Sequence, residues 1–265
     1  MLSAQQLAHF ETFGFLLLRQ VFPAAEMAQI IGAAEDHWQE VLQSQADAAE
    51  EVHPTRFVEE RPLLARLVED DRIYLPIQQL LGPGFVWGGS EGHKNLMETS
   101  PPHEWHCDRF GEIDLHYTRI KIMIYFQPMQ KETGTLRVLP GSHRLPFHRD
   151  LAEGLHPSQG RTSCKAFGVD GADLPCFPLE VTPGDVVVFN HYLFHGVYGE
   201  QNKRRYIAMK FADAPQTEAH YEALRAHGQD ASCLAAEFRY SDRPRIKGMV
   251  EKLLEWEEKL AATGG

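Results

Sequence analysis

The sequence lacks the features that would place it in a membrane or in an oxidising compartment. Its four cysteines are widely spaced and form no CxxC pair, which argues against a disulfide framework and a structural zinc site. No run approaches the ~18 apolar residues that a membrane span requires. The first residues contain neither a basic region nor an apolar signal segment. We therefore expect a cytoplasmic protein that does not bind membranes.

Clustered positive charge is also scarce. The chain carries 26 lysines and arginines against 37 aspartates and glutamates, a formal net charge of -11, and its one short basic run is 203–205. Nucleic acid is not an expected partner, because phosphate backbones are bound by clustered basic surfaces. At 265 residues, with 43% hydrophobic and 24% charged residues, the composition is ordinary for a globular enzyme. The sequence does not define an oligomeric state.

Helical patterns occupy the two ends of the chain. Ser3 is a predicted N-cap, followed by a helix to Phe10, a break at Gly14 and a short apolar strand over 15–18. Apolar residues at helical spacing predict further helices, over 23–45, 63–81 and 247–260.

The central part of the chain has β-strand character. Short β-rich runs alternate with turn residues, and they lie at 85–97, 118–126, 135–139, 179–181, 185–189, 192–198 and 204–212. This pattern predicts a mainly β sandwich or jelly roll rather than a βαβ fold. We treat 1–265 as a single domain, with a helical N-terminal flank over about 1–83, a β core over about 84–212 and a C-terminal helical segment over about 215–262. The stretch 141–178 has little periodicity and is predicted to be a functional lid or a mobile loop.

A His-x-Asp pair, His106 and Asp108, is the first candidate for metal binding. Residues i and i+2 of an extended segment project to the same side, so one metal ion can bridge them. An imidazole and a carboxylate suit Fe(II), and a second imidazole would complete the facial triad of non-haem iron oxygenases. Three protein ligands leave three positions, enough for a bidentate oxo acid and O2. Alone the pair is weak evidence, because the chain has 14 histidines and 37 acidic residues.

The distal histidine is expected on a later strand. His195 follows a Pro-Gly-Asp turn, a buried strand and a tight turn at Asn190 and His191, and we place it at the end of a second strand. A core histidine bonded to a backbone carbonyl is the alternative, and His191 has the same strand parity. Downstream, an arginine can hold a carboxylate by two parallel hydrogen bonds. Alternation does not choose between Arg204 and Arg205.

Five ordered segments together resemble the phytanoyl-CoA dioxygenase family of Fe(II)/2-oxoglutarate oxygenases. The helix, glycine and strand over 7–19 look like the family's opening, and 105–108 (Trp-His-Cys-Asp) matches its metal motif. The run 134–144 (GTLRVLPGSHR) is similar to its G-x-L-x-x-x-P-G-S-H segment and is the most specific string. The stretch from Pro183 to Gly196 and the arginine-led strand complete a match over about 5–212.

The resemblance implies a double-stranded β-helix (jelly roll, cupin-like) core with flanking α-helices. It implies Fe(II), 2-oxoglutarate and O2 as cofactor and cosubstrates, with iron held by His106, Asp108 and His195. The oxo-acid arginine falls at Arg204, with Arg205 as the alternative because the preceding loop is short. By position only, Lys94 and Asn95 are candidates for holding the oxo acid. His143 is expected to stabilise its turn rather than to bind metal.

The implied reaction is hydroxylation of a small metabolite, with succinate and CO2 as co-products. Desaturation or ring closure is open to the same site, whereas related halogenases need chloride where Asp108 stands. Nothing in the sequence demands a coenzyme A thioester, because no basic cluster is available for its phosphates. The segments 109–117 and 141–178 are expected to border the pocket. Two alternatives stay open: a zinc-dependent hydrolase using the same triad, and a non-catalytic protein that binds 2-oxoglutarate or metal.

Overall fold

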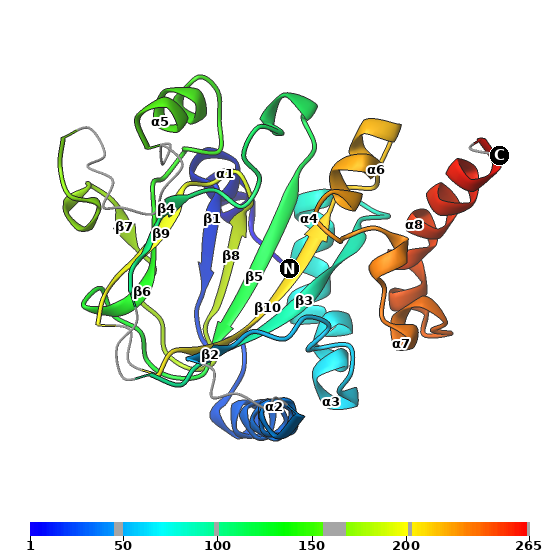
Figure 1. Ribbon diagram of the computed structural model, residues 1–265, viewed down its shortest axis with the longest axis horizontal. Helices are drawn as coiled ribbons and strands as arrows, with labels where there is room; N and C mark the ends of the chain where they lie inside the picture. Colours follow the sequence, from blue (N-terminus) through cyan, green and yellow to red (C-terminus); the bar gives the residue numbers. More distant parts are fainter. Residues whose placement is uncertain (45–49, 98–100, 156–167, 201–202, 264–265) are drawn as a thin grey trace.

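Two antiparallel sheets form the centre of the protein, as the computed structural model in Figure 1 shows. The structure describes residues 1–44, 50–97, 101–155, 168–200 and 203–263. The larger sheet has the strand order β1 (Phe15–Leu18), β8 (Val186–Asn190), β5 (Arg119–Tyr125), β10 (Arg205–Ala212), β3 (Val86–Asn95) and β2 (Glu51–Val52). The smaller has the order β4 (His103–His106), β9 (His195–Gly199), β6 (Thr133–Val138) and β7 (Phe177–Pro178). This is the predicted jelly-roll architecture.

Alternation along the strands gives each face of the larger sheet its own core. In β5, Ile120, Ile122 and Ile124 belong to the apolar cluster under the helices, whereas Met123 and Tyr125 belong to the cluster between the sheets. The second cluster also contains Leu136 and Val197 of the smaller sheet. Because successive side chains point to opposite faces, a strand that is buried on both sides reads as one apolar run.

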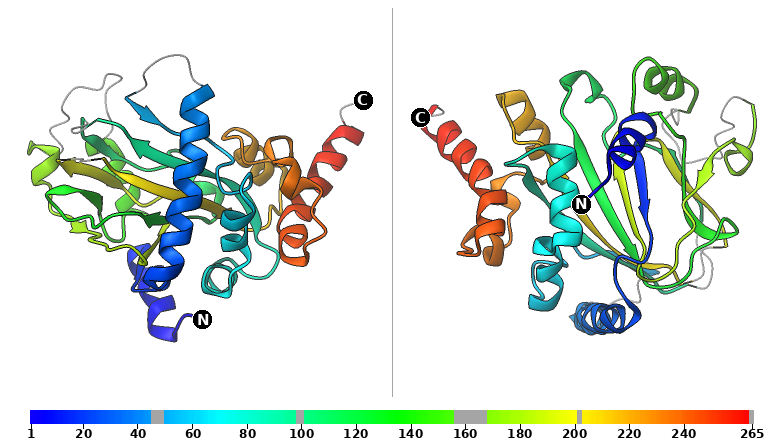
Figure 2. Two further views of the ribbon diagram at one scale, coloured as in Figure 1. Left: turned by 90° about the horizontal axis from the view of Figure 1, so that it is seen from below. Right: turned by 180° about the vertical axis from the view of Figure 1, so that it is seen from behind.

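Several helices cover the outer face of the larger sheet. The described helices are α1 (Ala4–Phe13), α2 (Ala24–Ser44), α3 (Pro62–Ala65), α4 (Asp71–Leu81), α5 (Phe147–Leu155), α6 (Glu218–Arg225), α7 (Ala236–Arg239) and α8 (Pro244–Thr263). Figure 2 shows α2 crossing this sheet, and its buried Met27, Ile30 and Trp38 join the outer cluster. Helix α8 adds Ile246 and Met249 to the same cluster. The helices therefore close one face of the sheet and leave the other for the site.

Several predicted boundaries are corrected. The helix predicted over 63–81 is divided into α3, a 3₁₀ turn at Arg66–Glu69 and α4, because the Asp70 carboxylate accepts a hydrogen bond from Arg72 N and caps a new helix. His195 begins β9 instead of ending a strand, since the Asn190 side chain accepts from Tyr192 N and extends the turn. Of the run 179–181, only Val181 makes a bridge, to Met129. The stretch 141–178 contains α5, and its residues 156–167 lie outside the described part.

The predicted Ser3 cap and Gly14 break are both confirmed. Ser3 and Gln6 form a capping box, and α1 ends at Gly14, whose φ is +82°. A Cβ at Gly14 would lie 2.5 Å from Nδ1 of His143, whose Nε2 is 3.1 Å from the Glu11 carbonyl oxygen. His143 thus packs against the end of α1, and its role is structural, as predicted.

Gly14→Ala is therefore expected to destabilise the protein by about 2 kcal/mol or more, because the left-handed conformation and the close approach to His143 both disfavour a side chain. Urea denaturation measures the loss. Gly32→Ala in α2 is the matched control: nothing lies within 4 Å of its added Cβ, and a gain of about 0.5–1 kcal/mol is expected. Equal urea midpoints for Gly14→Ala and wild type would contradict the proposed packing.

Candidate metal and cosubstrate site

Three predicted ligands converge where β4 meets β9. His106 ends β4 and is the backbone partner of His195, the first residue of β9, and their rings lie 4.3 Å apart between centroids. Asp108 follows two residues after His106. One ligand atom from each residue lies within 4.8 Å of the others, a spacing that fits a single metal ion.

The hydrogen bonds of the two histidines leave their Nε2 atoms available for a metal ion. Nδ1 of His106 is 2.7 Å from the Glu104 carbonyl oxygen, and Nδ1 of His195 is 2.9 Å from the Leu193 carbonyl oxygen. A proton on each Nδ1 therefore leaves Nε2 as the ligand, the arrangement that orients metal-binding histidines. Oδ2 of Asp108 is buried and has no hydrogen-bond partner among the described residues. Two imidazoles and one carboxylate on one side fit Fe(II).

A lysine beside Asp108 favours the ionised form of that carboxyl. Lys121 Nζ lies 3.7 Å from Asp108 Oδ2 and 2.8 Å from Glu91 Oε1, and Glu91 also binds Lys210. Burial alone would raise the pKa of the Asp108 carboxyl, but the charge of Lys121, followed by His195, holds it well below its usual range. Burial, with the charge of His106, lowers the pKa of His195 to about 3. At neutral pH both groups are in the form that binds metal.

The cavity at this site has a volume of about 280 Å³. Its apolar wall comes from both sheets, with Met123 and Phe189 on one side and Leu136 and Val197 on the other. Charged and imidazole groups line the remainder, and they are His53, Glu91, His103, His106, Asp108, Arg109, Lys121, His191, His195, Arg204 and Lys210. The three candidate metal ligands are among these polar groups.

The structure separates the two candidate arginines. Arg204 is buried, lines the cavity and lies over the ring of Tyr206, 4.8 Å from its centroid. Arg205 points to the other face of the sheet, where its guanidinium binds Glu35 of α2. Of the two, only Arg204 is brought together with the triad.

Lys94 and Asn95 do not join the site directly. Lys94 is the strand partner of Arg205 and binds the same Glu35, at 2.6 Å, on the helix-covered face. Asn95 lies beside Arg204, its backbone N donating to the Arg204 carbonyl, and its Oδ1 accepts from Met97 N. Neither is among the described residues that line the cavity. Position along β3 alone therefore misplaced Lys94, because its parity directs it under α2.

His191 and the Pro-Gly-Ser-His segment have roles distinct from the triad. His191 lines the cavity but is not part of the three-residue group, and burial holds its pKa well below the ordinary value. Ser142 Oγ accepts a hydrogen bond of 2.8 Å from Phe194 N. Leu139 N donates to the Phe194 carbonyl. The segment therefore fixes the backbone directly before His195.

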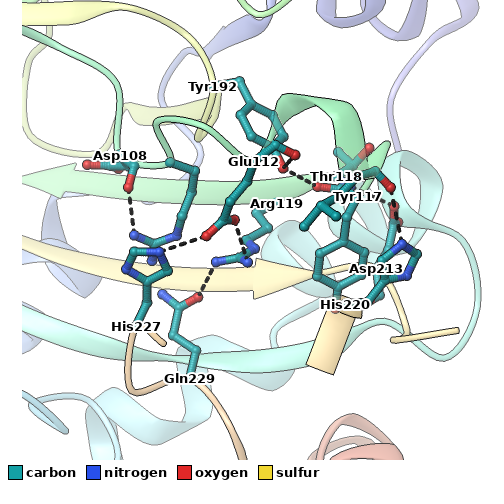
Figure 3. A network of polar contacts seen from close by, with 12 residues as sticks. Asp108, Glu112, Tyr117, Thr118, Arg119, Tyr192, Asp213, His220, His227 and Gln229 are labelled. Carbon is teal, nitrogen blue, oxygen red and sulfur yellow. Dashed lines mark hydrogen bonds and ion pairs between the residues drawn. The ribbon is translucent and has the colours of Figure 1, made fainter. Parts of the chain in front are cut away.

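Sequence reasoning missed the charged residues around the triad. Lys121 and Lys210 lie at inward positions of β5 and β10, opposite one another in register. A lysine inside the apolar run over 119–125 was the available signal. Beyond them, Arg119 binds Glu112 at 2.7 Å, and Glu112 also contacts His227, in the network that Figure 3 shows. His227 and Gln229 come from the C-terminal segment, so no local pattern could have predicted this network.

The β-helix and its facial triad define the class of non-haem iron oxygenases. The family model "Phytanoyl-CoA dioxygenase (PhyH)" matches residues 10–205, so the chain belongs to this family. It is an oxygenase that depends on iron(II) and 2-oxoglutarate. No curated protein matches the sequence significantly.

Solved structures share the fold. HygX from Streptomyces hygroscopicus, crystallised with nickel and 2-oxoglutarate, is 20% identical with a TM-score of 0.62, covering 82% of this chain and 89% of its own. EctD from S. alaskensis, crystallised with 2-oxoglutarate and 5-hydroxyectoine, is 22% identical with a TM-score of 0.61, covering 80% and 77%. The carbocyclase SnoK from nogalamycin biosynthesis is 20% identical with a TM-score of 0.61, covering 80% and 85%. Among the described residues, no helix is long and apolar enough to cross a membrane.

Proposed function

We propose that the protein hydroxylates a C–H bond of a small metabolite, with 2-oxoglutarate and O2 consumed and succinate and CO2 released. The observation that carries this proposal is the convergence of His106, Asp108 and His195 in a cavity that also contains Arg204. A cavity of about 280 Å³ favours a compact substrate, since sites for drug-sized ligands span about 300–1,000 Å³.

Each residue has a distinct task in this proposal. The triad would hold iron through the two histidine Nε2 atoms and the Asp108 carboxylate. Arg204 would bind the distal carboxylate of 2-oxoglutarate by charge-assisted hydrogen bonds. Lys121 keeps Asp108 ionised, and Met123, Leu136, Phe189 and Val197 keep water away. Bound iron and 2-oxoglutarate supply the oxidising chemistry, and the protein supplies position and a dry pocket.

Hydroxylation is proposed over the other reactions that an iron site of this kind supports. The fold accommodates other outcomes, since the similar structures include a carbocyclase and the epimerase SnoN. Asp108 occupies the third protein position, which supports hydroxylation over chlorination. A zinc hydrolase on the same triad would have no use for Arg204, a buried guanidinium on the cavity wall.

The first test is anaerobic spectroscopy of the wild-type protein. Metal-free protein is given Fe(II) and then 2-oxoglutarate, and the weak visible charge-transfer band of the chelate is recorded. We expect the band to appear with one iron per chain and to saturate with 2-oxoglutarate. Iron binding without a band would contradict the assigned cosubstrate. Failure to bind iron, with tight binding of zinc, would favour the hydrolase.

A further inference from the structure

The cavity contains more positive charge than iron and 2-oxoglutarate require. Four cationic side chains line it against two carboxylates, and they are Arg109, Lys121, Arg204 and Lys210 against Glu91 and Asp108. Lys121 and Lys210 both bind Glu91. In the proposed function, Arg204 receives 2-oxoglutarate and Asp108 receives iron. Arg109 is the cation left without an assignment.

Arg109 is buried, and no carboxylate of the described residues forms an ion pair with it. It is 8% exposed, its Nη1 donates 2.7 Å to the backbone carbonyl of Asp108, and its Nε has no hydrogen-bond partner among the described residues. Within the described chain it forms no ion pair within 4.0 Å. An isolated buried charge is costly, and structures retain one where something pairs with it. An anion that enters the cavity would supply a direct partner for this guanidinium.

The neighbouring carboxylate is already committed. Figure 3 shows Glu112 between Arg119 and His227. One Glu112 oxygen is 2.7 Å from Nη2 of Arg119, and the other is 2.7 Å from Nε2 of His227. Glu112 therefore satisfies a different guanidinium, and its geometry leaves Arg109 available.

A second unsatisfied group lines the same cavity. His191 is 1% exposed, and neither of its ring nitrogens has a hydrogen-bond partner among the described residues. Its backbone N donates to the carbonyl of Arg119, the first residue of β5. Arg204 lies instead near Tyr125, the last residue of that strand. Arg119 and Tyr125 are six residues apart on an extended strand, a distance of about 20 Å, so His191 and Arg204 lie toward opposite ends of the cavity.

We propose that the prime substrate is a compact acid whose carboxylate or phosphate group binds Arg109 and His191, at the end of the cavity opposite Arg204. The inference deepens the proposed function and rests on it. A guanidinium pairs with either oxyanion through parallel N–H donors, and a neutral imidazole adds one donor. Arg109 thus determines specificity, by selecting acidic molecules over their neutral analogues.

The test uses the full chain loaded with Fe(II) and saturating 2-oxoglutarate without oxygen. Binding of ¹³C-acetate and of inorganic phosphate is measured by the paramagnetic broadening of their ¹³C and ³¹P signals. We expect one of the two anions to bind, which distinguishes a carboxylate site from a phosphate site. In Arg109→Gln its affinity should fall about 10- to 100-fold, the loss of hydrogen bonds to a charged group. Arg109→Lys should restore part of it.

Arg149→Gln is the matched control, because Arg149 forms an exposed ion pair with Asp114 and is not among the described residues that line the cavity. It should bind the anion as wild type does. Binding of neither anion, or equal binding in Arg109→Gln, overturns the inference, and equal binding is also what direct attachment to iron would give. The charge-transfer band reports separately on the proposed function: its presence in all variants shows that they fold, and its absence in wild type rejects the oxygenase site itself.

Discussion

Asp108→Ala is expected to abolish iron binding at stoichiometric concentrations and, with it, turnover of 2-oxoglutarate. Loss of a residue that merely supports a metal ligand costs about 10- to 100-fold in affinity, so loss of the ligand itself should cost more than about 100-fold. Asp108 lies beside both Lys121 and His195, so its removal also takes away the negative charge next to these two groups. Anaerobic titration with Fe(II), followed by the charge-transfer band, measures the effect.

The fold should survive this substitution, because Lys121 keeps its contact with Glu91 at 2.8 Å. Asp114→Ala is the control. Asp114 lies six residues after Asp108, is exposed and forms an ion pair with Arg149. It should bind iron as wild type does. If Asp108→Ala retained the wild-type iron affinity, the metal would have to lie elsewhere.

Arg204→Gln is expected to raise the concentration of 2-oxoglutarate needed for half-saturation by about 30-fold or more. Removal of one partner from a buried charge pair costs about 2–5 kcal/mol, and 1.4 kcal/mol corresponds to a factor of ten. Iron affinity in the absence of 2-oxoglutarate should change little, since Arg204 is not one of the triad. The same anaerobic band, titrated with 2-oxoglutarate, gives the ratio.

Arg205→Gln separates this effect from a general loss of basic charge. Arg205 is the next residue in the sequence, but its partner is Glu35 on the helix-covered face. The dissociation constant of this variant for 2-oxoglutarate should stay close to that of wild type, because Arg205 is not among the described residues that line the cavity. Reversed effects of the two variants would move the cosubstrate site to Arg205.

The sequence was most informative where function depends on local spacing. His106 and Asp108 are two residues apart, so an extended segment was enough to place them together. His195 required a long-range pairing, and the ordered family segments supplied it. The jelly roll followed from short strands between turn residues. Parity alone did not choose between Arg204 and Arg205, because both faces of β10 are buried and either could carry a polar group.

The residues that sequence reasoning missed are those fixed by tertiary contacts. Arg109 lies in the segment 109–117 that was expected to border the pocket, but its particular role depends on Glu112. That carboxylate is already paired with Arg119 and His227, which lie seven and 115 positions away from Glu112. Lys94 was misplaced for a similar reason: its contact with Glu35 depends on how α2 lies across the sheet. The division of the helix over 63–81 depended on a single cap, Asp70, within an otherwise continuous apolar pattern.

The close approach between α1 and the Pro-Gly-Ser-His segment bears on how separable the parts of this enzyme are. Gly14 O accepts from Asn190 N and Phe13 O from Gly141 N, while Ser142 Oγ accepts from the amide of Phe194, next to the candidate metal ligand His195. Two backbone hydrogen bonds and the hydroxyl of Ser142 thus connect the end of the first helix with the segment before His195. The amino-terminal helix is mechanically part of the active site, so grafting or exchanging it between homologues alters the reaction centre as well as the surface.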